Sequence, residues 1–332
     1  MALIYYFIVT IVDTEIKLRV AIWTMIFFMT IVAGMGILQA HGTDITGMGM
    51  SWASDKKVWQ IRGIGNFDNP NDLAYSVVLI VPFAAGLFTQ WGKIFRQITG
   101  ALLMMISIYC IYLTRSRGGI LSLAACLAFW FYFRLSNKSL KRVGWLLALI
   151  GVVAAVTIQA SGYKDDASAM GRVEAWVAGM EMFSSHPLIG TGKNQFMEHH
   201  KRDSHNSFVE AGAELGLVGL YAYIGVLYST MFFLLKSASE NAGTDDEQRM
   251  YVNGFLGYVA SYCVASLFSS RTYDLVILLI IALVSANSRL YMAKSMDGPL
   301  APAYEITLWN KKVVLLTLLT LVLWKLFLIQ VY

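Results

Sequence analysis

Long apolar runs separated by short polar segments repeat along most of the chain. Each run is close to the roughly 20 residues that a helix needs to cross a hydrocarbon core of about 30 Å. A segment in lipid must satisfy its own backbone polar groups, so these runs are predicted to be helices. We expect spans near residues 20–38, 71–89, 98–113, 120–134, 143–160, 208–235, 251–268, 274–291 and 312–330.

The pattern therefore predicts an all-α polytopic integral membrane protein with about nine to ten transmembrane helices. We expect residues 1–332 to form a single membrane domain. The first apolar run, residues 2–12, is too short to span comfortably and lacks the basic region and cleavage site of a signal peptide. A truncated or re-entrant helix is the prediction for it.

The composition agrees with a membrane protein, because 57% of the residues are hydrophobic and only 14% are charged. Such a balance excludes a water-soluble domain. Cys110, Cys126 and Cys263 all lie inside apolar runs, which favours packing roles over a disulfide framework or a thiolate metal site. The net charge of +5 reflects membrane topology and indicates no nucleic-acid partner.

Lysines and arginines flank alternate connections, beginning with Lys17 and Arg19 and then Lys93 and Arg96. Because cytoplasmic loops carry the excess of positive charge, these connections are predicted to be inside. The outer connections are then residues 39–70, 114–119, 161–207 and 269–273. The loop 161–207 is long for a connection between helices, and a long loop is usually functional.

Two arginines, Arg115 and Arg117, occupy the short outer turn 114–119, where the charge rule predicts few cations. A guanidinium group stays protonated and presents a planar set of donors that matches phosphate. The pattern therefore indicates contacts to a lipid diphosphate. The alternative is that both side chains extend to lipid head groups or end their helices, and it applies more to Arg115 than to Arg117.

His205 stands where the long outer loop enters the span at 208–235. Its ordinary pKa is close to neutral pH, so it is a candidate general base, and an exposed loop histidine is the alternative. Ser207 and Glu210 have the spacing of a capping box, so we expect the helix to begin here. Glu210 and Glu214 would lie on one face near the helix start, and capping is the favoured role for both.

Several other polar groups have simple structural interpretations. Gly190 and Gly192 predict a simple turn, and the alternative is that they let the backbone approach a ligand. Arg271 and Asp274 predict an ion pair between two helix ends, with a third cationic ligand contact as the alternative. The segment from Gly65 to Asp72 predicts a turn and then an N-capped helix, whose polar side chains could also face a sugar.

No metal site or cofactor is expected. His199, His200, Asp203 and His205 are close in sequence, but their spacing matches neither a helical histidine pair nor a closed zinc pattern.

Taken in order, these segments resemble the O-antigen ligase and polymerase superfamily over residues 60–290. The most specific piece is His205–Asn206 followed by Gly216 and Gly219. The other matching segments are Asn66 to Ala74, Thr114 to Gly118, Gly171–Arg172 ahead of Trp176, and His186–Pro187–Leu188.

The resemblance implies transfer of a glycan from an undecaprenyl-diphosphate-linked donor to an acceptor hydroxyl, with inversion and without a metal. It implies His205 as the general base, with the donor diphosphate bound by Arg117, Arg172 and Arg115. Asn206, Glu210 and Arg271 would support these groups. It also implies a bacterial inner membrane protein whose active site, carried by the loop 161–207, faces the periplasm.

The acceptor stays open among lipid A core, the end of a growing polysaccharide and a protein hydroxyl, and the ligase reading is preferred. A ligase, a polymerase and a protein O-oligosaccharyltransferase would all fit the pattern. Two alternatives come from other classes of protein. A transporter or flippase would require charges at midplane depth, which the sequence does not show, and a noncatalytic scaffold would tolerate loss of His205.

Overall fold

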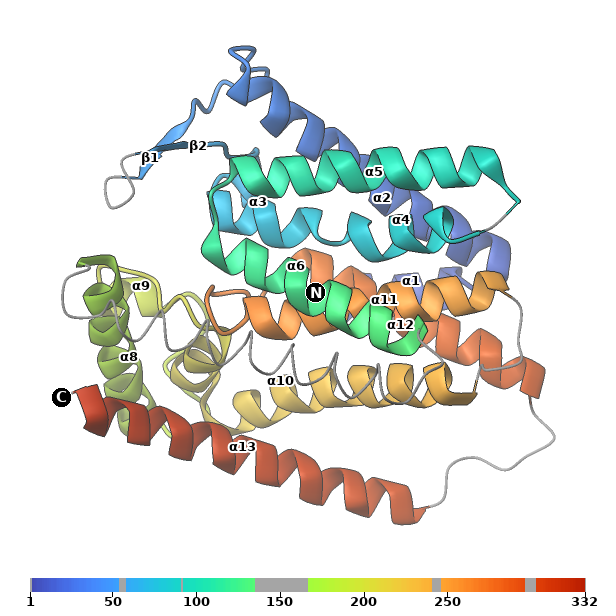
Figure 1. Cartoon of the computed structure of the whole chain (residues 1–332). Helices are drawn as coiled ribbons and strands as arrows, with labels where there is room; N and C mark the ends of the chain where they lie inside the picture. Colours follow the sequence, from blue (N-terminus) through green and yellow to red (C-terminus); the bar gives the residue numbers. More distant parts are fainter. Residues whose placement is uncertain are drawn as a thin grey trace. The chain divides into compact units, whose positions relative to one another are not determined.

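The computed structural model describes residues 2–53, 58–90, 92–134, 167–240, 246–295 and 303–331. Helices dominate this part of the chain, and one short antiparallel hairpin joins them (Figure 1). The elements are α1 (Ala2–Ile11), α2 (Glu15–Ala40), β1 (Ser51–Ala53), β2 (Val58–Gln60), the 3-10 helix η1 (Gly65–Phe67), α3 (Pro70–Val77), α4 (Ile80–Phe88), α5 (Ile94–Leu113), α6 (Arg117–Arg134), α8 (Ala167–Ser185), α9 (Phe196–His199), α10 (Ser207–Glu240), α11 (Asp246–Ala265), α12 (Leu275–Ser295) and α13 (Ala303–Val331).

The predicted fold class, an all-α polytopic membrane protein, is confirmed. Within the described residues, five helical segments are long and apolar enough to cross a membrane. They are Glu15–Ala40, Pro70–Phe88, Ile94–Leu113, Ser207–Ala238 and Asn310–Ile329. Shorter apolar helices occupy Ala2–Ile11, Arg117–Phe133 and Leu275–Leu290. The span expected at residues 143–160 lies outside the described residues.

The span expected near 71–89 is divided, since α3 ends at Val77 and α4 begins at Ile80. Pro82 lies in the first turn of α4 and has no backbone N–H, so it cannot donate to the carbonyl four residues earlier. The amide of Val81 donates instead to Val78 O at 3.1 Å, which tightens the chain locally. A proline near the start of a helical segment is therefore accommodated by a break.

The chain separates into two compact units. Unit 1 comprises Met1–Val156, Met231–Ala265 and Leu275–Leu290. In it α11 packs against α6 and α4, and α4 packs against α5 (Figure 1). At Gly100 on α5 an added Cβ would lie 2.5 Å from Ala84 O and 2.6 Å from Phe88 N, so the two backbones approach closely. Small residues at helix crossings permit this kind of packing in lipid.

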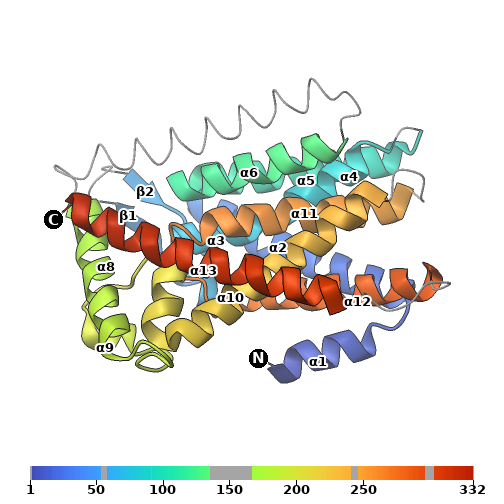
Figure 2. The ribbon, with the colours of Figure 1, turned by 90° about the horizontal axis from the view of Figure 1, so that it is seen from below.

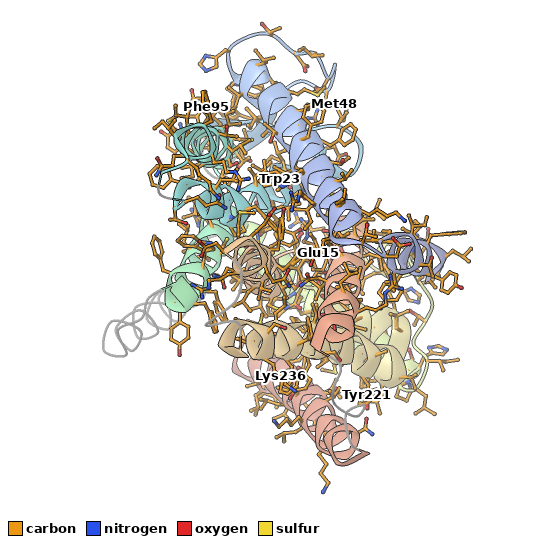
Figure 3. The ribbon with its side chains drawn as sticks, turned by 90° about the vertical axis from the view of Figure 1, so that its right-hand side faces the viewer. Glu15, Trp23, Met48, Phe95, Tyr221 and Lys236 are labelled. Atoms are coloured by element: carbon orange, nitrogen blue, oxygen red, sulfur yellow. The ribbon has the colours of Figure 1, made fainter. Side chains whose placement is uncertain are left out.

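Unit 2 comprises Thr157–Thr230, Ser266–Asp274 and Tyr291–Tyr332. Helix α8 lies beside α13 in it (Figure 2). Trp324 on α13 is buried in the core, and its Nε1 donates to Trp176 O on α8 at 3.2 Å. Tyr221 on α10, labelled in Figure 3, donates from its hydroxyl to Asn310 Oδ1 on α13 at 2.9 Å. The described part of the loop 161–207 is thus folded, with two helices, α8 and α9.

Helix α10 is interrupted at Gly216, whose φ of 66° and ψ of −163° are not helical. In an unbroken helix the amides of Leu217 and Val218 would donate to the carbonyls of Ala213 and Glu214. Those four backbone groups pair instead with the segment 187–192. The bonds are Leu217 N to Pro187 O at 2.8 Å, Val218 N to Leu188 O at 3.1 Å, Thr191 N to Ala213 O at 3.2 Å and Gly192 N to Glu214 O at 2.9 Å.

The simple turn expected at Gly190 and Gly192 is present, since Gly190 N donates to His186 O at 2.9 Å, but this pairing gives its glycines a further role. Gly190 has a φ of 70°, and a Cβ there would overlap the carbonyl of Glu214. A Cβ on Gly216 would lie 2.5 Å from Gly190 N and from Leu188 C. Both glycines are therefore required because two backbones meet without room for a side chain.

Candidate functional site

The arginine turn, residues 114–117 in unit 1, is held by buried hydroxyl groups. Ser116 caps α6, because its Oγ accepts a hydrogen bond from Gly119 N at 3.0 Å. The same Oγ donates to Asn71 Oδ1 at 2.6 Å. Thr114 is fully buried, and its Oγ1 accepts from Ser116 N at 3.3 Å. The turn is therefore rigid and is fixed to α3.

The two arginines of this turn differ in their surroundings. Arg115 has a left-handed backbone, with a φ of 52°, and its guanidinium carbon lies 4.1 Å from the centre of the Tyr112 ring. Arg117 is exposed in the first turn of α6, and no hydrogen bond or ion pair joins it to another described residue. Arg117 is therefore the better placed of the two to contact a ligand.

The expected N-capped helix after residue 65 is confirmed. Asn69 caps α3 by accepting from Asn71 N at 2.8 Å, and Pro70 occupies the first helical position. The start of α3 packs against the start of α6, where a Cβ on Gly118 would overlap the hydroxyl of Tyr75. The Asn-Pro-Asn segment and the arginine turn thus form one cluster within unit 1.

His205 in unit 2 also lies on a rigid turn. Its φ is 48°, a left-handed conformation that is uncommon outside glycine. The neighbouring residues hold it there: Ser204 Oγ donates to Asn206 O at 3.0 Å and accepts from Asn206 N at 3.3 Å. Ser204 Oγ also lies 2.7 Å from Ser270 Oγ. The imidazole is half-buried, while Ser204 and Asn206 are buried.

The N-cap of α10 is Asn206, and the predicted capping box of Ser207 and Glu210 is wrong. Asn206 Oδ1 accepts from Phe208 N at 2.9 Å and from Val209 N at 3.2 Å. Ser207 bonds to another segment, because its N donates to Ser266 O at 2.8 Å and its Oγ donates to Ser269 O at 2.9 Å. The partners of Ser207 therefore come from the turn 266–272, which is distant in sequence, and not from Glu210.

The turn 266–272 supports the start of α10 from the other side. Arg271 N donates to Ser207 Oγ at 2.8 Å, and Thr272 Oγ1 donates to Ser207 O at 2.9 Å. The Arg271 side chain is 5% exposed and forms an ion pair with Asp274, as the favoured interpretation predicted. Arg271 thus stabilises the turn on which the His205 segment rests.

Both glutamates near the start of α10 accept hydrogen bonds from other segments. Glu210 Oε2 accepts from Thr272 N at 3.2 Å. Glu214 is almost completely buried, and its carboxylate accepts from Phe196 N and Asn194 N, both at 2.9 Å, and from the Tyr273 hydroxyl at 2.7 Å. The favoured helix-capping role is therefore wrong for both. An acidic residue inside an apolar run was the available signal for Glu214.

Burial and nearby charges set the protonation of His205. Burial lowers the pKa of His205 below its ordinary value, and the positive charges of Arg172 and Arg202 lower it further. Asp203 acts in the opposite direction. His205 is therefore neutral at neutral pH, as a general base must be. The electrostatic influence of Arg172 on His205 shows that unit 2 brings these two predicted residues close together.

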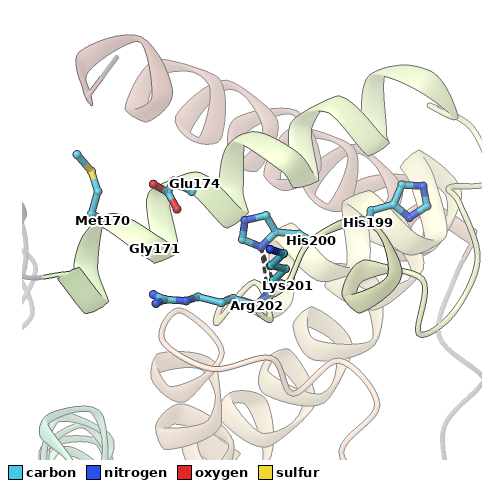
Figure 4. A pocket seen from close by; sticks show the side chains of 7 residues that line it. All are labelled: Met170, Gly171, Glu174, His199, His200, Lys201 and Arg202. Carbon is cyan, nitrogen blue, oxygen red and sulfur yellow. Dashed lines mark hydrogen bonds between the residues drawn. The ribbon is translucent and has the colours of Figure 1, made fainter. Parts of the chain in front are cut away.

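A pocket of about 610 Å³ lies beside this turn (Figure 4). Its lining residues are Met170, Gly171, Glu174, His199, His200, Lys201 and Arg202. Arg202 reaches Gly171 from across the pocket, and a Cβ on Gly171 would overlap its guanidinium group. The next residue on α8, Arg172, has a buried Nε without a hydrogen-bond partner in the described part of the chain. The guanidinium groups of Arg172 and Arg202 therefore place positive charge near His205.

No metal-binding chemistry is indicated in the described ranges, where no three histidine, cysteine, aspartate or glutamate side chains form a group able to hold an ion. His199 and His200 instead make local contacts. His199 Nδ1 lies 2.9 Å from Gln195 O, and His200 Nδ1 accepts from Arg202 N at 3.2 Å.

Comparison with known proteins agrees with the motifs. Residues 102–224 match a family model described as O-Antigen ligase. The predicted resemblance to the O-antigen ligase and polymerase superfamily is confirmed. A curated relative, the exopolysaccharide production protein ExoQ of Rhizobium meliloti (strain 1021), is 24% identical over 229 residues, covering 60% of this chain and 53% of the relative. The chain thus spans about half the length of that relative. Together with the apolar helices, these matches indicate a bacterial membrane protein.

Proposed function

We propose that this protein transfers a glycan from an undecaprenyl-diphosphate-linked donor to an acceptor hydroxyl at the periplasmic face of the bacterial inner membrane. The observation that carries the proposal is the His205 turn, whose backbone is held by Ser204 and whose neutral imidazole lies near cationic side chains. The family match and the polysaccharide-related relative support a glycan-processing function of the O-antigen ligase or polymerase type.

His205 accepts the proton of the acceptor hydroxyl as its oxygen attacks the anomeric carbon of the donor. The new bond joins that carbon to the acceptor oxygen. The bond from the carbon to the diphosphate oxygen breaks, and undecaprenyl diphosphate leaves with the electron pair. A single displacement of this kind inverts the anomeric centre. The neutral state of His205 suits the proton transfer, because only an unprotonated imidazole can accept the proton of the acceptor hydroxyl.

The arginines stabilise the negative charge of the leaving diphosphate. Arg117 is exposed and makes no hydrogen bond or ion pair with another described residue. Arg172 lies near His205, and its Nε has no hydrogen-bond partner among the described residues. Guanidinium groups form paired, charge-assisted hydrogen bonds with phosphate oxygens. Their charge removes the need to protonate the leaving group, so the proposed step requires no metal. Arg115 contributes charge from its place over Tyr112.

In this proposal Asn206, Glu210 and Arg271 hold His205 in place and do not contact the reacting groups. Asn206 caps the helix that carries the turn, and Glu210 and Arg271 bind the start of that helix to the turn 266–272. The preferred acceptor is a lipid A core hydroxyl, which makes the protein a ligase. A second candidate acceptor is the end of a growing polysaccharide, favoured by the similarity to an exopolysaccharide production protein. A protein hydroxyl is the third.

The test is transfer of glycan in liposomes from a purified undecaprenyl-diphosphate donor to each candidate acceptor. We expect wild type to transfer and His205→Ala to be slower by about 10²- to 10⁴-fold, the usual contribution of a general base. His41→Ala is the matched control, because His41 is an exposed histidine whose Nε2 bonds only to Tyr109 among the contacts described here. Arg96→Ala, an exposed arginine at the other end of α5, is the control for Arg117→Ala.

The outcomes separate the remaining classes of function. Normal transfer by a correctly inserted His205→Ala protein contradicts the role of His205 as the general base. Movement of the donor across the bilayer, without transfer by wild type, supports a flippase. Wild type that neither transfers nor moves lipid, but restores polymer assembly in cells even as His205→Ala, supports a scaffold.

A further inference from the structure

The hairpin β1–β2 in unit 1 presents two tryptophans on one face. Trp52 is the direct cross-strand partner of Trp59, and their ring centres are 5.2 Å apart with the planes at 61°. Trp52 is 50% exposed and Trp59 is 57% exposed. Side chains alternate between the faces of a strand, so the pair covers the outward face while Gln60 points inward and is buried. We call Trp52 and Trp59 the tryptophan pair.

An isolated hairpin of two strands is only marginally stable in water, so the anchoring of this one is informative. Gln60, the last residue of β2, donates from its Nε2 to Thr114 O at 2.8 Å. Thr114 begins the arginine turn, directly before Arg115. A buried hydrogen bond therefore links the hairpin to the backbone that carries Arg117.

The first strand is anchored through the loop that precedes it. Gln39, at the end of α2, donates to Asp44 Oδ1 at 3.3 Å and accepts from Arg62 N at 3.0 Å. The Arg62 side chain donates in turn to Gly49 O at 2.9 Å and to Met48 O. Hydrogen bonds, first of all from the Thr46 hydroxyl, lower the pKa of Asp44 to about 2. The segments on both sides of the hairpin are therefore joined by a hydrogen-bonded network, in which Asp44 stays ionised at working pH.

We propose that the tryptophan pair is a platform for sugar rings of the donor glycan, at a place beyond the arginine turn. The inference rests on the proposed function. A lipid-linked donor has its diphosphate between the lipid and the sugars, so a protein that holds the diphosphate at Arg117 meets the glycan on the side away from the membrane. The hairpin is the element fixed to that turn by Gln60.

The chemistry of the pair suits a sugar. The face of an indole ring is electron-rich, and the C–H groups on one face of a pyranose ring carry partial positive charge. Two rings set at an angle offer two adjacent contact faces without a charged group. Because the hairpin is anchored rigidly, less conformational entropy is lost when a ligand binds. The platform therefore holds sugars by shape and stacking, while the arginines hold phosphate by charge.

The competing occupant is the lipid head-group region, where exposed tryptophans commonly lie. An interfacial anchor requires only a certain depth in the membrane. The tryptophan pair is instead fixed by hydrogen bonds to a particular place near the arginine turn, and this favours a ligand that contacts both.

The test compares two donors, one with a single repeating unit and one with several, in the liposome assay. For Trp52→Leu and Trp59→Leu we expect the KM of the long donor to rise about threefold to tenfold for each ring, the usual range for losing one aromatic stacking contact. kcat and all constants for the short donor should be unchanged. Leucine keeps the position apolar, so a lipid anchor would be largely preserved. Trp→Phe variants should recover part of the loss.

Phe95→Ala is the control, since Phe95 is 84% exposed and lies at the start of α5, whereas the arginine turn follows the end of that helix. Binding is read independently by adding the free oligosaccharide, without lipid, and recording tryptophan fluorescence. Wild type should respond, and the double Trp→Phe variant should respond less. This readout keeps the inference testable if no transfer is found.

Equal losses with the short and the long donor, or no change with either, overturn the platform. So does a fluorescence change produced by brominated lipids and not by oligosaccharide, which assigns the pair to the membrane interface.

Discussion

The arginine turn of unit 1 and the His205 turn of unit 2 have the same local construction. In each, a residue with a left-handed backbone, Arg115 with a φ of 52° or His205 with a φ of 48°, directly precedes the N-cap of a long helix. The caps are Ser116 and Asn206, and both are buried. The difference is exposure: Arg115 and Arg117 are both exposed, whereas His205 is half-buried, and burial together with the charges of nearby arginines keeps it neutral.

This difference matches the chemistry that each turn is proposed to perform. A guanidinium group is charged at any working pH, so it is best left in water until a phosphate replaces the solvent. An imidazole must be neutral to accept a proton, and burial favours the neutral form. The same backbone arrangement therefore presents exposed guanidinium groups in unit 1 and a half-buried imidazole, the proposed base, in unit 2.

The largest effect on the transfer rate should come from replacing the proposed functional side chain of each turn. We expect His205→Gln to lower kcat by about 10²- to 10⁴-fold, because the amide keeps the size and hydrogen bonding but takes up no proton. Arg117→Lys should lose only about tenfold, since it keeps the charge and loses the paired geometry. Transfer rates in liposomes at matched insertion give both values. Similar losses for the two variants would contradict the division of roles.

The second prediction concerns the break in α10, which has no counterpart at the start of α6. Gly216→Ala should destabilise the protein by about 3 kcal/mol, because its ψ of −163° at positive φ is nearly restricted to glycine. Gly34→Ala on α2 is the control, as nothing lies within 4 Å of the added Cβ. It should stabilise by about 0.5 to 1 kcal/mol. The free energy of unfolding in mixed micelles distinguishes them, and equal values would contradict the break.

The third prediction compares the two caps. Asn206→Ala should cost about 2 kcal/mol and Ser116→Ala about 1 kcal/mol, because the Asn206 side chain accepts two backbone hydrogen bonds and that of Ser116 accepts one. Asn206→Asp should retain the cap and most of the stability. The same unfolding measurement applies, with the rate of transfer recorded alongside. A larger cost at Ser116 would reverse the expected order.

The smallest effect is a shift in the pH profile of kcat/KM. The rate should fall as the pH decreases through the pKa of His205, which lies below its ordinary value. Arg172→Gln removes a positive charge, raises that pKa and moves the acid limb to higher pH by less than about one unit. Asp203→Asn should move it to lower pH, and Arg117→Lys should leave it in place. A shift with Arg117→Lys would mean that the limb does not report His205.

Sequence reasoning was most successful where the signal is local. The apolar runs predicted membrane helices, and Asn69 with Pro70 marked the start of α3. It failed where a local pattern had a distant competitor. Ser207 and Glu210 have the spacing of a capping box, but the turn 266–272, about 60 residues away in sequence, supplies their hydrogen-bond partners.

Gly190 and Gly216 show the same limit. Each was consistent with an ordinary turn or a close helix contact, and neither sequence position indicates that the two backbones meet. The pairing of residues 187–192 with the broken segment of α10 depends on backbone hydrogen bonds, which leave no side-chain pattern. Glu214 was assigned to capping because its distant donors, Asn194 N, Phe196 N and the Tyr273 hydroxyl, cannot be identified from spacing.

The sequence by itself determined the membrane fold class, the location of most membrane helices among the described residues, and the polar segments in which His205, Arg117 and Arg172 occur. It could do so because helix length and hydropathy depend on residues within a few positions of one another. Only the tertiary structure decided that Arg115 lies over an aromatic ring while Arg117 lies over none among the described residues, why His205 is neutral and what holds its turn in place. Burial and the charges of Arg172, Arg202 and Asp203 set that pKa, and both depend on which segments the fold brings together.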